Sequence, residues 1–344
     1  MKGAPQSLKC WALTEGFAGM ENQCVGLAEA VGIPCEVKHV RRPRAPLMYL
    51  PPRFWPKPLN RTATGVFLAP PWPDLLISSG RGSVAAALAV REASARKTFA
   101  VHIQSPYVRP SYFDLVVVPL HDSLRGNNVL VARTALHRIT RERLSEAAQR
   151  FKAVFSHLPH PLIAVLVGGS NKHQQFSADV LCRLADGLVQ AARESGGSLA
   201  VTPSRRTGKE NERILRELLR SVPTFFWDGA SDNPYLGILA LSDAIVVTSD
   251  SVSMASEASA TGKPLYVFSV GAEGGKLHEF HKTLMKDGIA RPFTDTVQWW
   301  SYNPPDETGK IAALVRERME AARALTCGNA IFPAFETAPG DIRL

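Results

Sequence analysis

Residues 244–264 read Ala-Ile-Val-Val-Thr-Ser-Asp-Ser-Val-Ser-Met-Ala-Ser-Glu-Ala-Ser-Ala-Thr-Gly-Lys-Pro, and this stretch decides the fold. The apolar run 244–247 predicts a buried strand, and the small polar residues after it predict the start of a helix near Val252. A strand that turns into a helix points backbone N–H groups, and the positive end of the helix dipole, at whatever lies above the strand end. The join is therefore a candidate anion site in an α/β fold.

The side chains of this join add to the candidate site. Asp250 or Ser251 can cap the helix, and Ser253 brings a hydroxyl near its first turn. Glu257 lies one turn beyond Ser253 on the same face, where a carboxylate can hold two ribose hydroxyls. An ordinary capped helix with a solvated Glu257 is the structural alternative, because Ser and Asp favour helix starts in any protein.

Length and composition set the class of protein. The chain has 344 residues, 45% of them hydrophobic, which predicts a globular protein with two domains. No apolar stretch approaches the ~20 residues that span a bilayer, and residues 1–9 lack the apolar core of a signal peptide, so we expect a cytoplasmic protein. The five cysteines are scattered without CxxC spacing, which favours reduced thiols over disulfides or a zinc site.

The formal charge of +9 favours an anionic partner. No nucleic-acid-binding signature accompanies it, so we expect no nucleic-acid partner. In segment 41–57, Arg and Lys alternate with large apolar and aromatic residues. This mixture suits peripheral contact with an anionic membrane, here the inner face of the cytoplasmic membrane. A loop packed down by its own aromatic residues is the alternative.

Apolar runs of strand length alternate with helix-period segments along the whole chain, which predicts an α/β fold with parallel sheets. In the first half we expect strands near 8–13, 35–40, 75–77, 98–103, 115–118 and 129–132, and helices at 21–31, 82–95 and 141–157. In the second half we expect strands at 162–167, 199–202, 224–227, 244–247 and 265–268, and helices at 174–193, 210–219, 234–241, 252–260 and 311–325. The predicted domains are 1–158 and 159–303, and the segment 304–344 is a helix and tail that cross back to the first domain.

Two further loops follow strands of the second half. The turn 168–170 is Gly-Gly-Ser, in which glycine allows close approach of a ligand phosphate, and Lys172 can neutralise that phosphate. The loop 204–206 is Ser-Arg-Arg and brings two guanidinium groups to the strand ends, the edge where open sheets bind ligands. A common Gly-Gly turn and a solvated basic loop are the respective alternatives.

The loop 14–19, Thr-Glu-Gly-Phe-Ala-Gly, has only part of a dinucleotide fingerprint, so we expect it to admit an acceptor substrate and not NAD. Glu15, His102, His121 or Asp122 can act as a general base, while most of the four will be structural. The pair His278 and His281 does not have HExxH spacing, so no metal site is expected. The loop 271–276 is predicted to be a mobile gate.

Several motifs together resemble one family. They are 11–14 with Gly19 and 22–23, Gly80-Arg81, His121-Asp122, 167–169, 204–207, 233–235 and 248–258. These resemble the family named after the plant mitochondrial-fission factor Elongated Mitochondria One, and the chain looks like a bacterial member. More distantly, the second half is similar to GT-B glycosyltransferases and nucleotide-sugar epimerases. That resemblance implies two Rossmann-type domains with parallel sheets facing a central cleft, ribose on Glu257 and phosphate near 251–253.

We therefore predict a metal-independent glycosyltransferase with a nucleotide-sugar donor and a cell-envelope glycan or lipid acceptor. No cofactor is expected beyond this substrate, and UDP-, GDP- and CMP-linked donors stay open. A non-catalytic scaffold of the same fold, acting at a membrane or partner protein, and a nucleotide-sugar epimerase are the alternatives. The predicted donor-site residues are Gly168, Gly169, Ser170, Lys172, Ser204, Arg205, Arg206, Asp250, Ser251, Ser253, Met254 and Glu257. The predicted acceptor-site residues are Gly16, Gly19, Asn22, Gln23 and Arg81, and the predicted catalytic residues are Glu15, Asp122 and His102.

Overall fold

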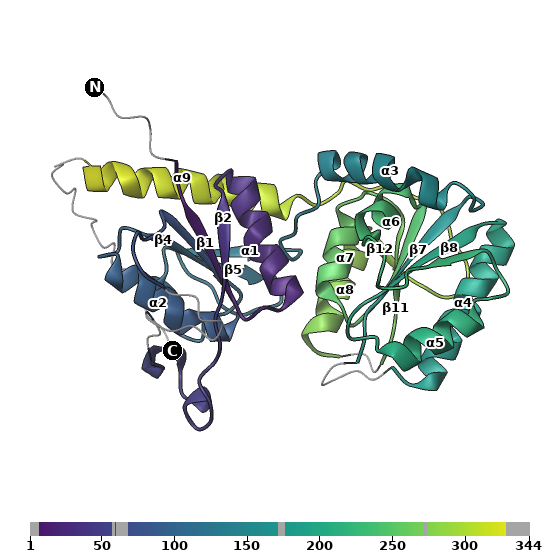
Figure 1. Cartoon of the computed structure of the whole chain (residues 1–344), viewed down its shortest axis with the longest axis horizontal. Coiled ribbons are helices and arrows are strands. Elements are labelled where there is room, and N and C mark those ends of the chain that lie inside the picture. Colours follow the sequence, from purple (N-terminus) through teal and green to yellow (C-terminus); the bar gives the residue numbers. More distant parts are fainter. Residues whose placement is uncertain (1–6, 57–58, 60–67, 171–175, 272–273, 328–344) are drawn as a thin grey trace, which may run out of the picture.

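The computed structural model describes residues 7–56, 59, 68–170, 176–271 and 274–327. These residues form two α/β units, each built on a six-stranded parallel sheet (Figure 1). Lys172, one of the predicted donor-site residues, lies outside the described residues. The predicted α/β class with two parallel sheets is confirmed.

The first unit contains β1 (Cys10–Thr14), α1 (Ala18–Val31), β2 (Cys35–His39), β3 (Leu75–Ser79), α2 (Val84–Ala93), β4 (Phe99–Ile103), β5 (Leu115–Pro119) and β6 (Val129–Ala132). Four short 3₁₀ turns add to it, at Leu47–Tyr49, Pro52–Phe54, Arg81–Ser83 and Pro110–Tyr112. The strand order is β2-β1-β3-β4-β5-β6. The direction in which successive strands are added therefore reverses between β1 and β3. Open α/β sheets bind ligands at such a switch point, beyond the carboxyl ends of the strands.

The second unit contains α3 (Arg141–Phe155), β7 (Leu162–Val167), α4 (Ala178–Ser195), β8 (Ser198–Pro203), α5 (Lys209–Leu218), β9 (Thr224–Phe226), α6 (Tyr235–Leu241), β10 (Ala244–Thr248), α7 (Val252–Ser259), β11 (Leu265–Phe268), α8 (Gly275–Lys286) and β12 (Ala290–Pro292). Its sheet has the order β12-β11-β10-β7-β8-β9, which is the Rossmann order with a switch point between β7 and β10. The strands β7 and β10 are buried along their whole length, because helices cover both faces of a parallel sheet.

The last helix, α9 (Glu307–Cys327), returns to the first unit and lies along α1 (Figure 1). Ile311, Val315 and Met319 of α9 join the core that β1 and α1 form, as predicted for the C-terminal helix. Helix α3 instead packs against α6, and its Phe151 and Phe155 belong to the core of the second sheet. The domain limits 1–158, 159–303 and 304–344 stay predictions, with α3 packed on the second of these units.

Of the α-helices and strands in the described residues, two have no counterpart in the sequence-based prediction. Helix α8 starts at Gly275, inside the loop 271–276 that we expected to be a mobile gate; residues 272–273 lie outside the described part of the chain. The Gly-Gly at its start is typical of a turn and concealed the helix, although Leu277, Phe280, Leu284 and Met285 recur at helical spacing. Strand β12 has only three residues and ends at Pro292, so its pattern is too short to predict a strand.

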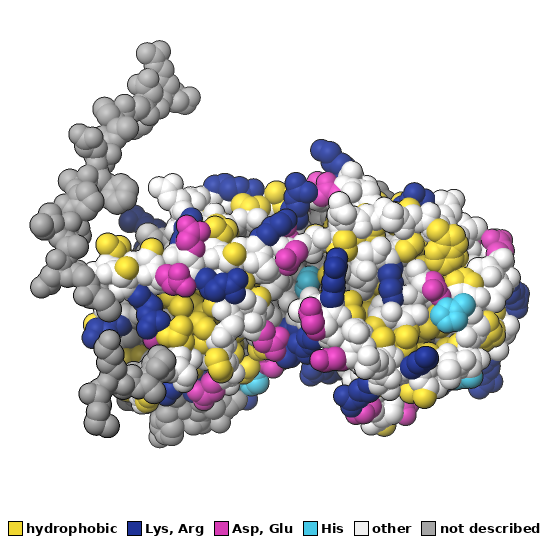
Figure 2. All heavy atoms as spheres, turned by 90° about the horizontal axis from the view of Figure 1, so that it is seen from above, with side chains coloured by type: hydrophobic (Ala, Val, Ile, Leu, Met, Phe, Trp, Pro, Cys, Tyr) yellow, Lys and Arg dark blue, Asp and Glu magenta, His cyan; other side chains and the backbone are white. Residues whose placement is uncertain are grey.

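The surface carries its positive charge in a dispersed form. Figure 2 shows Lys and Arg side chains spread over both units on the face of α9 and α3, with acidic side chains between them. None of the helices in the described ranges combines the length and the apolar character that crossing a bilayer requires.

Candidate functional site

Asp250 joins the loops at the switch point of the second sheet. Its side chain has 0% exposure, and its Oδ2 accepts hydrogen bonds from the backbone N–H of Gly169 at 2.9 Å and from Nη2 of Arg206 at 3.0 Å. The hydroxyl of Thr248 donates to Oδ1 at 2.7 Å. The carboxylate thus stands where an anion bound by the turn 168–170 would lie.

This arrangement gives the two glycines a different role from the one that their sequence suggests. A Cβ atom on Gly168 would lie 2.1 Å from both carboxylate oxygens of Asp250, and one on Gly169 would lie 2.0 Å from the backbone carbonyl carbon of Arg206. The absence of side chains therefore allows the loops to approach one another. The close approach of a ligand phosphate to these glycines, which the sequence predicts, is not needed to explain them.

Glu15 plays the same part at the switch point of the first sheet. Its carboxylate accepts from the backbone N–H of Gly82 at 3.1 Å and from Nε and Nη2 of Arg42 at 2.7 and 3.0 Å. A Cβ atom on Gly82 would lie 2.3 Å from the carboxyl carbon of Glu15. Each switch point is thus closed by a carboxylate that binds a backbone N–H of the neighbouring loop and an arginine.

Helix α7 is capped by Ser251, whose Oγ accepts from the N–H of Met254 at 3.3 Å. Of the two caps that the sequence allows, Asp250 is therefore not the one used. Ser253 faces the first unit, because a Cβ atom on Gly19 would lie 2.9 Å from its Oγ. The first turn of α1 and the first turn of α7 consequently meet between the units.

Glu257 lies deeper in α7 and is only 8% exposed. The hydroxyl of Tyr235 donates a hydrogen bond to its Oε2. Burial raises the pKa of Glu257, and the hydrogen bond from Tyr235 acts in the opposite direction. The carboxylate is therefore held by one partner, and its Oε1 has no hydrogen-bond partner among the described residues.

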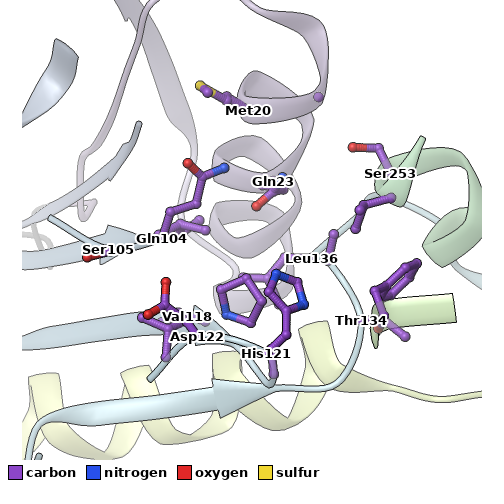
Figure 3. Close-up of a pocket in the computed structure, with 18 of the residues that line it drawn as sticks. Met20, Gln23, Gln104, Ser105, Val118, His121, Asp122, Thr134, Leu136 and Ser253 are labelled. Atoms are coloured by element: carbon purple, nitrogen blue, oxygen red, sulfur yellow. The ribbon is translucent and has the colours of Figure 1, made fainter. Parts of the chain in front are cut away.

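A cavity of about 430 Å³ lies between the two units (Figure 3). Its polar lining consists of Gln23, Gln104, Ser105, His121, Asp122, Arg133, Thr134, Ser253 and Lys276. Nζ of Lys276 in α8 lies 3.7 Å from Oδ2 of Asp122, and this ion pair spans the units, as does the pair of Arg133 and Asp287. Burial and the positive charge of Lys276 lower the pKa of His121, while Asp122 raises it.

Four of the predicted site residues line this cavity, Gly19, Gln23, Asp122 and Ser253, and so does His121, the other candidate general base. The acceptor residue Arg81 lies elsewhere, where it donates to the carbonyl of Leu50 at 3.0 Å and lies over the rings of Trp55 and Tyr107. Outside the cavity, Gly16 makes a turn at φ +82°, Asn22 is partly exposed and Arg205 is exposed. The hydroxyl of Ser170 accepts a hydrogen bond from the N–H of Phe176, and the hydroxyl of Ser204 accepts one from the N–H of Arg206. The sequence-based site thus divides between the cavity and the closed loops.

Gln104 and Lys276 line the cavity but were not predicted as site residues. Gln104 directly follows strand β4. Ligands of open α/β sheets bind beyond the carboxyl ends of strands, so this position could have identified Gln104 from the sequence. Lys276 lies in α8, which the sequence did not predict.

His102, a predicted catalytic residue, lies in the core of the first unit and does not line the cavity. It has 0% exposure, its Nδ1 is 2.8 Å from Oγ of Ser78, and its ring lies 5.0 Å from that of Phe113. Burial lowers the pKa of His102 to about 3. A neutral core histidine accounts for all of these contacts.

We expect His102 to destabilise the fold in acid. Below pH 6.5 the imidazole of the unfolded chain takes up a proton, whereas His102 of the folded protein stays neutral down to about pH 3. The free energy of unfolding therefore falls by roughly 1.4 kcal/mol per pH unit in this window as the pH is lowered. Urea unfolding between pH 7 and 4 measures this dependence of the free energy of unfolding on pH. The contribution of His102 should be absent in His102→Gln and present when the exposed His157 is replaced by Gln. Parallel stability curves for wild type and His102→Gln would contradict the assignment.

Comparison with known proteins identifies the family. The family model described as mitochondrial fission ELM1 matches residues 18–319. The chain belongs to the mitochondrial fission ELM1 family. The resemblance seen in the sequence is thereby confirmed.

Two relatives show how far the ELM1 likeness extends. The chain is 33% identical to the mitochondrial fission protein ELM1 of Arabidopsis thaliana over 276 residues, which are 72% of this chain and 64% of the plant protein. It is 26% identical to the uncharacterized protein RP120 of Rickettsia prowazekii over 282 residues, 71% of this chain and 79% of that protein. The chain thus spans less than two thirds of the plant relative.

Solved structures extend the comparison to the fold. A structure of UDP-GlcNAc 2-epimerase from Methanocaldococcus jannaschii aligns with a TM-score of 0.56 at 12% identity, covering 93% of this chain and all of that one. The complex of that enzyme with UDP-GlcNAc and UDP gives 0.53 at 14% identity, again over 93% of this chain and all of that one. At this identity the likeness shows the fold, and it confirms the predicted GT-B-like class for this ELM1-family chain.

Proposed function

We propose that this ELM1-family protein is a glycosyltransferase that binds a nucleotide-sugar donor and transfers the sugar to a cell-envelope glycan or lipid. One observation carries the proposal. The cavity between the units brings the first turn of α7 and Lys276 of the second unit opposite His121 and Asp122 of the first. Lys276, a cation, and His121 and Asp122, which can exchange protons, thus line one cavity that is large enough for part of a substrate.

The donor diphosphate is assigned to the start of α7. Ser253 and Lys276 line the cavity there, and the helix dipole favours an anion at the same place. The ribose is assigned to Oε1 of Glu257, the oxygen that Tyr235 leaves free. The M. jannaschii epimerase of the same fold was solved with UDP-GlcNAc and UDP, which supports a nucleotide sugar as the ligand class. UDP, GDP and CMP are all compatible with these contacts.

Asp122 is assigned as the general base. In the proposed transfer, an acceptor oxygen forms a bond to the anomeric carbon, the bond from that carbon to the diphosphate oxygen breaks, and the acceptor proton passes to Asp122. The leaving diphosphate carries away the electron pair, and Lys276 with the α7 terminus meets its charge. The proposal invokes no metal ion.

The acceptor is assigned to the envelope because of a protruding segment. Residues 41–56 protrude from the first unit in Figure 1, with Trp55 buried against it, and they expose Tyr49 by 74%, Phe54 by 57% and Leu50 by 43%. Exposed Arg residues accompany these apolar side chains. Aromatic and basic side chains together suit the headgroup region of an anionic membrane, so the proposal includes peripheral membrane contact.

A non-catalytic scaffold is the second candidate. The observation that favours it is the closure of both switch points by Asp250 and Glu15, which fill the places where ligands of open α/β sheets usually bind. The name of the plant relative, a mitochondrial fission protein, agrees with a structural role. The epimerase alternative has support from the fold alone.

Calorimetric titration with UDP, GDP, CMP and ADP separates these candidates. We expect at least one nucleotide to bind the wild type, and Glu257→Ala to weaken that binding by about 10- to 100-fold, because a charged hydrogen bond to ribose is lost. Glu217→Ala, which removes an exposed carboxylate of α5, is the control and should bind like the wild type.

Two results would count against the proposal. If no nucleotide binds the folded wild type, the donor site does not exist and the scaffold is favoured. If a nucleotide binds equally well to Glu257→Ala, the ribose lies elsewhere.

A further inference from the structure

Gln104 has an unusual backbone conformation at the rim of the cavity. It follows β4 directly with φ +82°, in the left-handed region that glycine adopts without strain and other residues rarely do. Its N–H donates to the carbonyl of Val117 at 2.7 Å, so the chain is fixed in this conformation. If the turn alone mattered, glycine would serve best at this position. A strained non-glycine residue at a cavity therefore suggests that its side chain has a function.

The side chain of Gln104 projects into the cavity. Figure 3 shows it rising from the end of β4 on the side of helix α1, which carries Gln23. Neither amide group has a hydrogen-bond partner among the described residues, although Gln23 is only 9% exposed. A carboxamide offers two donor hydrogens and one acceptor oxygen. Two amides facing one cavity can thus bind a neutral ligand that carries several hydroxyl or amide groups.

The remaining lining combines uncharged and charged side chains. Ser105 adds a hydroxyl group and Met20 adds an apolar surface, whereas the charged side chains are those of Asp122, Arg133 and Lys276. Sugar rings present hydroxyls at their edges and C–H groups on their faces, so uncharged polar and apolar side chains in combination match them. An anionic group would find its partner at Lys276.

We infer that Gln104 and Gln23 form a subsite for an uncharged sugar ring, with hydroxyl or acetamido groups bound by the two carboxamides. This inference rests on the proposed function, and it adds the position and the chemistry of the sugar. The sugar belongs either to the donor or to the acceptor, and both present the same groups.

The test compares nucleotide and nucleotide-sugar affinity. UDP, UDP-glucose, UDP-GlcNAc and, at saturating UDP, free N-acetylglucosamine are titrated into the wild type and Gln104→Gly. Glycine removes the amide and also relieves the backbone, so the variant should fold at least as stably as the wild type. We expect its affinity for a sugar-bearing ligand to fall by about 10-fold, as for one lost hydrogen bond, with UDP affinity unchanged.

Ala95→Gly is the matched control, because Ala95 is also a non-glycine residue at positive φ, +50°, on the exposed surface. It should leave all affinities unchanged. Weaker binding of a UDP-sugar to Gln104→Gly would assign the subsite to the donor, and weaker binding of free N-acetylglucosamine would assign it to the acceptor.

Several outcomes overturn the inference. If Gln104→Gly binds every sugar-bearing ligand like the wild type, Gln104 does not contact the sugar. If the wild type binds UDP but gains no affinity from either attached sugar and does not bind the free sugar, the subsite is absent and the proposed nucleotide site stands. If the wild type binds none of UDP, GDP and CMP and does not bind the sugar, the proposed function fails together with the inference.

Discussion

Gly169→Ala is expected to destabilise the protein by about 1–3 kcal/mol or more, the usual cost of forcing an extra group into a packed interior. The new methyl group would stand 2.0 Å from the backbone carbonyl carbon of Arg206, and backbone cannot turn away as a flexible side chain can. Either the turn 168–170 or the loop around Arg206 must therefore move. Such a movement would also pull the Gly169 N–H away from Asp250. The Asp250 side chain is buried, so water cannot replace the lost hydrogen bond.

Urea unfolding followed by circular dichroism measures this effect, with Gly126→Ala as the control. A Cβ atom on Gly126 would meet side chains and no backbone, a methyl group of Val129 at 3.3 Å and Oδ1 of Asn128 at 3.9 Å, so the control should change stability by less than about 0.5 kcal/mol. Equal stability of the two variants would show that the close approach of the two loops does not constrain the fold. Nucleotide affinity of Gly169→Ala at a temperature where it is folded would show whether the same loops support the ligand.

Asp122→Asn is expected to reduce sugar transfer by about 10²- to 10⁴-fold, the usual contribution of a general base. The structure distinguishes the three predicted catalytic residues. Asp122 lines the cavity beside His121, the carboxylate of Glu15 is bound by Arg42 and Gly82, and His102 is enclosed in the core. Of these three residues, only Asp122 can therefore reach an acceptor hydroxyl in the cavity. Asn keeps the size of the side chain and removes its basicity.

The rate is measured as release of nucleoside diphosphate from the nucleotide sugar that binds, with a cell-envelope extract as the acceptor source. Glu15→Gln and His102→Gln are the comparison variants, and per folded molecule they should keep turnover within about 10-fold of the wild type. Nucleotide affinity of Asp122→Asn should not fall, because the donor is assigned to the other unit and the variant only removes the ion-pair partner of Lys276. Full activity in Asp122→Asn, or a loss confined to Glu15→Gln, would exclude Asp122 as the base.

Together these observations describe a candidate site between the two units. The sequence places ligand contacts in the loops beyond the strand ends of each sheet, and the structure shows that Asp250 and Glu15 tie those loops together. The open space lies instead where α1 and α7 meet between the units. The hydrogen bonds of Asp250 and Glu15 to neighbouring loops fix the start of α7 and the turn after β1.

The sequence by itself determined the α/β class and the parallel sheets. Strands such as β7 and β10 are continuous apolar runs because both of their faces are covered, and this pattern is local and readable. The family resemblance likewise rested on contiguous motifs, above all the stretch from β10 into α7. Helix α8 escaped prediction because its Gly-Gly start is typical of a turn, although its apolar residues recur at helical spacing.

Only the tertiary structure decided what the polar residues do. Asp250 and Gly169 are 81 positions apart, and Lys276 and Asp122 meet across the two units. A carboxylate beside a helix start looks the same in the sequence whether it caps the helix, binds a ligand or bonds to another loop. The choice depends on which groups the fold brings within about 3 Å, because hydrogen bonds and steric exclusion act only at that range. Local patterns therefore determine the elements, and the packing of distant loops determines the site.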